Sequence, residues 1–254
     1  MIDTHCHLDI PAFDHDRLEV LERARQAGVV QCLIPGVRLS DFPRMMAHAS
    51  PELLIAFGLH PIYLEDHPVD GVAQLESWVV RCKPVAIGEI GLDFLEPAQS
   101  HEAQRILLEE QLRLAKQYRL PVLLHVRKAH DQVFSLLRRL AFPWGGIAHA
   151  FNGSLQQAHR LLDLGFCLGF GGVVTYERAR RIRHLATVLP DEALVLETDA
   201  PDLSPVGQAG KRNEPCNLLA VAQTLAELRH MELGRIMEIT THNARNVLGL
   251  SGRC

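Results

Sequence analysis

Eight short apolar runs alternate with amphipathic segments along the 254 residues of this chain. Each run has the length of one buried strand, and the runs are Met1–His7, Val29–Ile34, Leu53–Leu59, Pro84–Ile90, Leu120–His125, Gly145–His149, Phe166–Phe170 and Ala193–Glu197. The segments between them carry apolar residues three and four positions apart, the period of an amphipathic helix, and cover Asp16–Ala27, Val72–Arg81, Glu102–Tyr118, Ala129–Leu140, Leu155–Leu164 and Glu177–Leu189. Two further helices, Pro215–His230 and Leu233–Val247, are predicted after a turn-rich loop over Pro201–Glu214.

Repeated strand-then-helix units indicate a parallel sheet, because parallel neighbours need a crossover between them. Eight such units predict a TIM (β/α)8 barrel. A doubly wound open sheet is the competing architecture, but it usually has fewer strands and an edge. Within Glu102–Tyr118 the period places Ile106, Leu112 and Ala115 against the strands. The alternation has no linker or low-complexity break, so we expect one domain over residues 1–254.

Composition narrows the setting and the partners. The formal net charge is only −4, so no overall basic field attracts nucleic acid, and any polyanion binding must be local. The six cysteines include no C-x-x-C pair and several lie in apolar runs, which is typical of reduced thiols in a cytoplasmic protein. No apolar run approaches the ~20 residues of a membrane span. The first run follows no basic-then-apolar leader, so we expect neither export nor membrane association.

Histidine and acidic residues recur where the predicted strands end. His5 and His7, two apart in the first run, project to the same face of an extended strand, although His-x-His alone is weak evidence for a metal. Further runs end near His60, Glu89, Asp93, His125, His149, Glu197 and Asp199. A lone histidine at a strand end is more often solvent-facing than a ligand. Because the carboxyl ends of barrel strands meet at one mouth, the recurrence predicts a metal site there.

Several segments occur in the order and at the spacing of one known family. They are Asp3-Thr4-His5-Cys6-His7, Gly58-Leu59-His60-Pro61, Gly88-Glu89-Ile90-Gly91-Leu92-Asp93, His125-Val126-Arg127, His149-Ala150-Phe151-Asn152-Gly153-Ser154, Leu196-Glu197-Thr198-Asp199-Ala200-Pro201, Arg212-Asn213-Glu214-Pro215 and Thr241-His242-Asn243-Ala244. These segments resemble the TatD family of metal-dependent hydrolases and deoxyribonucleases nearly from end to end. The stretch Phe94-Leu95-Glu96-Pro97 after Asp93, and Asp202 after Pro201, resemble its YjjV-type branch.

The resemblance implies a TIM barrel of the metallo-dependent hydrolase type that holds two divalent ions per chain, Mg²⁺, Mn²⁺ or Zn²⁺. The implied ligands of one ion are His5, His7, Glu89 and Asp199, and those of the other are Glu89, His125 and His149. Glu89 bridges the two ions with its two oxygens, and the nucleophile is a metal-bound hydroxide, available at neutral pH. Asp199 also accepts the proton of that nucleophile.

Other polar groups around this centre are candidates for binding an anion. Arg127 offers a planar fork for two phosphate oxygens, and His60 can hydrogen-bond or protonate a leaving oxygen. Asp93 and Glu197 can orient the ligating imidazoles. Asn152-Gly153-Ser154 is either a phosphate-binding turn or the plain N-cap of the next helix.

Two basic clusters lie outside this set. Lys211 and Arg212, in the loop Leu203–Arg212, are either a solvated pair or a contact to a nucleic-acid backbone. The arginines at 178, 180, 181 and 183 are expected mostly to face water. The loop Leu203–Arg212 beside Asp199 is a candidate lid, judged from position alone.

The residues and the resemblance together indicate a metal-dependent phosphodiester hydrolase acting on DNA, a monomeric exonuclease that trims single-stranded or frayed ends. The same ligand set also suits attack on a carbonyl carbon, so an amidohydrolase or esterase, including one that cleaves an aminoacyl-tRNA ester, is the alternative. A catalytically silent metal-binding protein is the third interpretation, which a complete ligand set disfavours.

Overall fold

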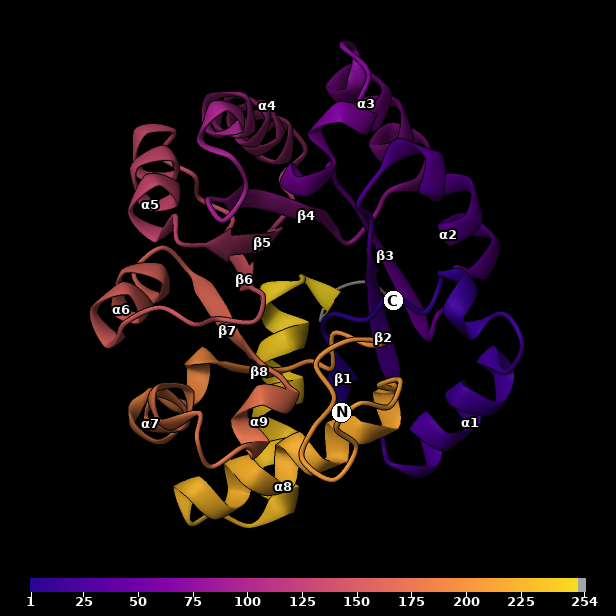
Figure 1. Ribbon diagram of the computed structural model, residues 1–254, viewed down its shortest axis with the longest axis vertical. Coiled ribbons are helices and arrows are strands. Elements are labelled where there is room, and N and C mark those ends of the chain that lie inside the picture. Colours follow the sequence, from indigo (N-terminus) through magenta and orange to yellow (C-terminus); the bar gives the residue numbers. More distant parts are fainter. Residues whose placement is uncertain (251–254) are drawn as a thin grey trace.

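Eight parallel strands pair in sequence order around the centre of the computed structural model, which describes residues 1–250 (Figure 1). They are β1 Ile2–Asp3, β2 Gln31–Pro35, β3 Leu53–Phe57, β4 Ala86–Asp93, β5 Val122–Arg127, β6 Gly146–Ala148, β7 Phe166–Phe170 and β8 Leu194–Leu196. The last strand meets the first where the N–H of Thr4 donates to the Leu196 carbonyl over 3.0 Å and Cys6 bridges to Ala200. The predicted TIM barrel is confirmed.

The helices surround this ring of strands (Figure 1). They are α1 Arg17–Gln26, α2 Phe42–His48, α3 Gly71–Cys82, α4 His101–Tyr118, α5 His130–Arg139, α6 Leu155–Leu162, α7 Arg180–Val188, α8 Leu218–Arg229 and α9 Leu233–Val247. Short 3₁₀ turns lie at Pro11–Phe13, Leu39–Asp41, Pro61–Asp66, Ala98–Ser100, Gly172–Thr175, Asp191–Ala193 and Pro215–Asn217.

The last helix closes one end of the barrel. Ala244 of α9 and Leu248, just after it, pack in one buried cluster with side chains from the starts and middles of the strands, including Ile2, Val85 and Val195. In Figure 1 α9, in yellow, crosses behind the strands. With that end filled, the opposite end, where the strands finish, is left for a site.

The first strand is shorter than the predicted run Met1–His7. β1 ends at Asp3, so His5 and His7 lie in irregular chain beyond it and not on one strand face. The reason is local: the Asp3 side chain accepts the His5 N–H over 3.2 Å, a turn that competes with strand pairing. Helix α2 was not predicted, since its seven residues span only about two turns.

One interpretation left open by the sequence, that of Asn152-Gly153-Ser154, is decided by local contacts. Ser154 caps α6 by accepting the Gln157 N–H over 3.2 Å, and the Gln157 side chain returns the bond to the Ser154 N–H. This capping box confirms the plain N-cap interpretation of that segment.

The five cysteines within residues 1–250 are all free thiols. In the same range, no helix has both the length and the apolar character to cross a membrane.

Candidate metal centre

Seven predicted site residues gather at the carboxyl end of the barrel. Five of them follow strands, namely His5, His7, His60, His149 and Asp199, while Glu89 and His125 lie within β4 and β5. All except the buried His5 line one cavity of about 360 Å³. The strand-end pattern therefore identified residues that the fold does bring together.

Glu89, in β4, lies at the centre of the group and is almost fully buried. Its Oε2 lies 3.2 Å from Nε2 of His5, while its Oε1 lies 3.0 Å from Nδ1 of His125 and 3.4 Å from Nε2 of His60. Burial opposes ionisation of Glu89, but the imidazoles of His5 and His60 hold its pKa well below the ordinary value. The carboxylate is thus ionised and presents one oxygen to each of two histidine groups.

Asp199 forms a second acidic centre just after β8. Its Oδ1 lies 3.7 Å from Nε2 of both His5 and His7 and 3.6 Å from Nε2 of His149. Asp199 adopts a left-handed conformation with φ of 56°, which Asp tolerates better than most residues. Its N–H donates to the His5 carbonyl over 2.8 Å, so the chain ends after β1 and β8 hold each other in register.

Two carboxylates orient two of the imidazoles. Nε2 of His125 contacts Oδ2 of Asp93 over 2.9 Å, so its Nδ1 faces Glu89. Nδ1 of His149 lies 3.1 Å from Oε1 of Glu197, so its Nε2 faces Asp199. These are the contacts expected for Asp93 and Glu197 from the sequence. A carboxylate behind an imidazole fixes the ring and raises its basicity as a ligand.

His60 differs from the other histidines in its hydrogen bonding. Its Nδ1 accepts the Ile62 N–H over 3.2 Å, which places the single proton of a neutral ring on Nε2. Burial lowers the pKa of His60, although Glu89 opposes that shift, so the ring is neutral at pH 7. Nε2–H therefore points at Glu89 as a hydrogen-bond donor.

The donor set fits a divalent cation. Both ring nitrogens of His5 are buried and form no hydrogen bond within the described residues, although Nε2 lies against two carboxylates. Burial lowers the pKa of His5, which keeps the lone pair free. Its ring also stacks on His149, with 3.5 Å between centroids. A bound cation stabilises such an arrangement, in which the lone pair of a buried neutral imidazole faces two carboxylates.

Comparison with known proteins identifies the family. The sequence profile of the TatD related DNase family matches residues 2–249. The chain belongs to this family. The metal-dependent hydrolase YjjV of Escherichia coli strain K12 is 43% identical over 246 residues, which cover 95% of each chain. The crystal structure of that YjjV superimposes with a TM-score of 0.93, at 42% identity and with 97% of each chain covered.

A more distant relative carries an activity in its name. The 3'-5' ssDNA/RNA exonuclease TatD of Pantoea ananatis is 33% identical over 263 residues, covering 98% of this chain and 100% of that one. The resemblance to the TatD family and its YjjV-type branch is thereby confirmed. This TatD-family protein is a metal-dependent hydrolase that acts on ester bonds.

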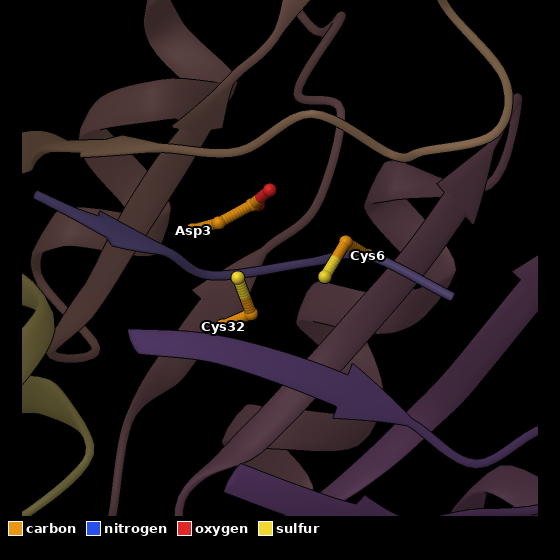
Figure 2. Close-up of side chains that lie close together, drawn as sticks. All are labelled: Asp3, Cys6 and Cys32. Carbon is orange, nitrogen blue, oxygen red and sulfur yellow. The ribbon is translucent and has the colours of Figure 1, made fainter. Parts of the chain in front are cut away.

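A further cluster of possible ligands lies behind the centre of this TatD-family protein. Donor atoms of Asp3, Cys6 and Cys32 come within 4.8 Å of one another where the chain after β1 passes β2 (Figure 2). The Asp3 carboxylate is already occupied, because it accepts the N–H groups of His5 and Thr198 and the Thr198 hydroxyl. Asp3 therefore ties together the two chain segments that carry His5 and Asp199.

The cationic groups expected and observed at the cavity differ. Nη1 of Arg127 lies 3.4 Å from Oδ2 of Asp93, its side chain is 52% exposed, and it is not among the residues that line the cavity. Arg38 and Arg44 do line it, and the sequence analysis did not select them. Arg38 comes soon after β2, whose end carries no histidine or acid, so the strand-end criterion passed over it.

Proposed function

We propose that this protein hydrolyses phosphodiester bonds of DNA and removes nucleotides from single-stranded or frayed ends, using two divalent ions. The observation that carries the proposal is the position of Glu89. One of its oxygens faces His5 and the other faces His125, so a single buried carboxylate can serve two ions. Paired ions of this kind occur in many phosphodiester-cleaving enzymes.

The proposed ligands follow the contacts around the two acidic centres. One ion is held by His5, His7, Glu89 and Asp199, and the other by Glu89 together with His125 and His149. Donor atoms of His5, His7 and Asp199 come within 4.8 Å of one another, which supports the first set. For the second set, Glu89 forms one such group with His149 and His5 and another with His125 and His60. When bound, the ions supply a water of lowered pKa and neutralise charge that develops on a phosphoryl group.

The remaining groups act on protons and on the substrate. Asp199, ionised because the histidines around it outweigh its burial and lower its pKa, accepts the proton of the attacking water. His60 donates a hydrogen bond from its Nε2–H to the leaving oxygen, the role that its neutral tautomer permits. Arg127 holds a phosphate oxygen with N–H groups beyond the one near Asp93, since half of its side chain is exposed.

The name of one relative supports single-stranded nucleic acid as the substrate class. The Pantoea ananatis relative, 33% identical over nearly the whole chain, is named a 3'-5' ssDNA/RNA exonuclease. The cavity over Glu89 has a volume of about 360 Å³, small enough to favour one nucleotide unit at a chain end over an intact duplex.

One observation favours a carbonyl substrate instead. The arginines that line this cavity are already paired, Arg38 with Asp41 over 3.0 Å and Arg44 with Asp14. A phosphodiester gains from cations that are free to meet it, whereas a neutral ester or amide does not need them. An amidohydrolase or esterase acting on a carbonyl group is therefore the second candidate.

Hydrolysis by the metal-replenished protein separates the two candidates. An end-labelled single-stranded oligonucleotide, bis-p-nitrophenyl phosphate and a carboxylic-ester panel are assayed with Mg²⁺ or Mn²⁺, with EDTA, and with the Glu89→Ala variant. We expect phosphodiester cleavage that EDTA and the substitution both abolish. Cleavage that survives in Glu89→Ala contradicts the metal-centre proposal. Ester cleavage without phosphodiester cleavage assigns the protein to the carbonyl class.

A further inference from the structure

The cavity of about 360 Å³ at the candidate metal centre is called the metal cavity below. A second and larger cavity, of about 1000 Å³, adjoins it. Its lining residues come from 173–182, around the start of α7, and from 201–212 in the loop after β8. Pro201 and Asp202 line both cavities, so the two lie side by side at these residues. We call the larger one the strand cavity. Its volume lies at the upper end of ordinary ligand sites, which span roughly 300–1,000 Å³.

The strand cavity is cationic in a protein whose formal net charge is −4. Its charged lining residues are one acid, Asp202, and the basic residues Arg178, Arg180, Arg181, Lys211 and Arg212. Arg212 is neutralised by Asp16 and Glu214.

The other four cations of the strand cavity differ from those over the metal ligands. Arg178, Arg180, Arg181 and Lys211 are exposed and form no ion pair with an acid of residues 1–250. In the metal cavity, by contrast, the arginines are paired. The local positive potential that the sequence requires for polyanion binding is therefore found here.

Hydrogen bonds hold the two walls at a fixed separation. The Tyr176 hydroxyl donates to the Ser204 carbonyl over 3.0 Å, and the Val206 N–H donates to Oγ1 of Thr175 over 2.8 Å. A Cβ at Gly172 would lie 2.1 Å from the Leu203 carbonyl oxygen, so the walls touch at the base. The loop is thus anchored to the segment after β7. Because the loop is already anchored, cations on opposite walls can bind a ligand without the entropic cost of ordering a free loop.

The lining also offers a flat apolar surface between the charges. The Arg178 guanidinium lies over the Tyr176 ring, 5.1 Å from its centroid, and Ile182 and the 40% exposed Leu203 lie on the two walls. A nucleotide combines an anionic phosphate with a flat base that stacks on aromatic and guanidinium planes. An inorganic anion alone needs no such surface.

We propose that the strand cavity binds the nucleotides of a single strand that follow the one at the metal centre. Arg178, Arg181 and Lys211 contact the phosphates, and Tyr176 with Leu203 contacts the bases. This inference rests on the proposed function, because it makes the strand cavity the continuation of that substrate site. It also explains why the arginines that line the metal cavity can be paired with acids. The cations that hold the strand lie in the neighbouring strand cavity.

The test uses the triple variant Arg178→Ala, Arg181→Ala, Lys211→Ala. Binding of fluorescein-labelled dT10 is followed by anisotropy in the Glu89→Ala background, where the oligonucleotide is not cleaved. Loss of three phosphate contacts lowers the slope of log affinity against log salt by about 2 and the affinity at 0.1 M salt by about 100-fold. In the cleavage-competent background, the ratio of kcat/KM for dT10 to that for bis-p-nitrophenyl phosphate should fall by a similar factor.

A matched control removes three exposed cations at the opposite end of the barrel that form no ion pair with an acid of residues 1–250. Lys83, Arg119 and Arg138 lie at or near the ends of α3, α4 and α5, and their triple alanine variant loses the same charge. We expect its affinity for dT10 and its salt slope to match those of the unaltered protein. The charge reversal Lys211→Glu is a single exposed change, and the dT10 affinity of this variant gives a second test of the strand cavity alone.

The possible outcomes separate the two proposals. Unchanged dT10 affinity in the strand-cavity triple, or an equal loss in the control triple, overturns the strand cavity as a nucleic-acid site. So does displacement of dT10 by a polyglutamate peptide at lower concentration than by unlabelled dT10, which would indicate an acidic protein partner. Absence of all phosphodiester cleavage by the unaltered protein instead contradicts the proposed function, while the anisotropy comparison still decides whether this cavity binds the strand.

Discussion

Gly169, in the middle of β7, makes room for the carboxylate that orients His149. A Cβ at this position would lie 2.0 Å from Oε2 of Glu197. Oε1 of the same carboxylate accepts the Ala150 N–H over 2.6 Å and lies 3.1 Å from Nδ1 of His149. The absence of one methyl group therefore makes room for the acid after β8 that orients the His149 imidazole, one of the proposed metal ligands.

We expect Gly169→Ala to weaken metal binding, because the displaced Glu197 no longer fixes the His149 ring. Losing a carboxylate behind a ligating imidazole typically lowers metal affinity by about 10–100-fold. Isothermal titration with Mn²⁺ or Zn²⁺ measures the change. The control is Gly234→Ala, where an added Cβ meets nothing within 4 Å. An unaltered affinity in Gly169→Ala would mean that Glu197 does not position this ligand.

The sequence could indicate Glu197 but not Gly169. A carboxylate at a strand end is visible as a residue type at a predicted position, and the contact to His149 agrees with that expectation. The need for glycine depends on the register that pairs Gly169 with Val195 across β7 and β8. A register between two predicted strands cannot be read from either strand by itself.

At the scale of elements, α4 supports the ends of two strands with two buried glutamines. Gln104 accepts the Asp93 N–H over 2.8 Å and donates to the Asp93 carbonyl over 3.1 Å. Two turns later, Gln111 makes the same pair of bonds to Leu59, at 2.8 and 3.0 Å. Each side-chain amide thus supplies the backbone hydrogen bonds that a neighbouring strand would otherwise supply to Asp93 or Leu59 at the end of the sheet.

Gln111→Leu should destabilise the fold, since it leaves a buried N–H and a buried carbonyl of Leu59 without partners. Each unpaired group costs about 1–3 kcal/mol, so we expect a loss of about 2–6 kcal/mol in the free energy of unfolding. Urea denaturation measures it. Gln117→Leu, an exposed glutamine of the same helix that bonds to Glu76, should change stability by less than about 1 kcal/mol. Equal losses in both would contradict a specific role for Gln111.

Periodicity predicted α4 well but its buried face only in part. Leu112 and Ala115 are buried as expected, whereas Ile106 is 52% exposed and its predicted burial is wrong. The helix face that meets the barrel includes Gln104 and Gln111, and a hydrophobic pattern counts glutamine as solvent-facing. The strands were easier to predict, because continuous apolar runs are distinctive. The prediction failed for the end of β1, where the Asp3 side chain accepts the backbone N–H of His5.

At the scale of the whole molecule, an ion-pair network joins the loop after β8 to the first helix. Arg212 and Arg23 both bind Glu214, at 3.0 and 2.8 Å, and both also contact Asp16. Residues nearly 200 positions apart thus meet across the join between the last and the first strand. The sequence contains these charges, but only closure of the barrel brings them face to face.

The network predicts how stability changes with pH. Burial opposes ionisation of Glu214, but Arg23 and Arg212 lower its pKa below the ordinary 4.5. A carboxyl with a lowered folded-state pKa binds its proton more readily in the unfolded chain, so its stabilisation is present above about pH 4.5 and is lost as pH falls through the folded pKa. Glu214→Gln should therefore destabilise the protein by about 1 kcal/mol at pH 7.

The difference between Glu214→Gln and the unaltered protein should then shrink as the pH falls from 7 to 3, because the unaltered carboxyl also becomes neutral. Urea denaturation at several pH values gives the difference directly, and titration of the metal centre, common to both proteins, cancels in it. Glu238→Gln is the control, since Glu238 is exposed and lies 3.5 Å from Arg235 within one helix. A difference for Glu214→Gln that stays constant across this range would show that the closure of the barrel does not depend on the charge of Glu214.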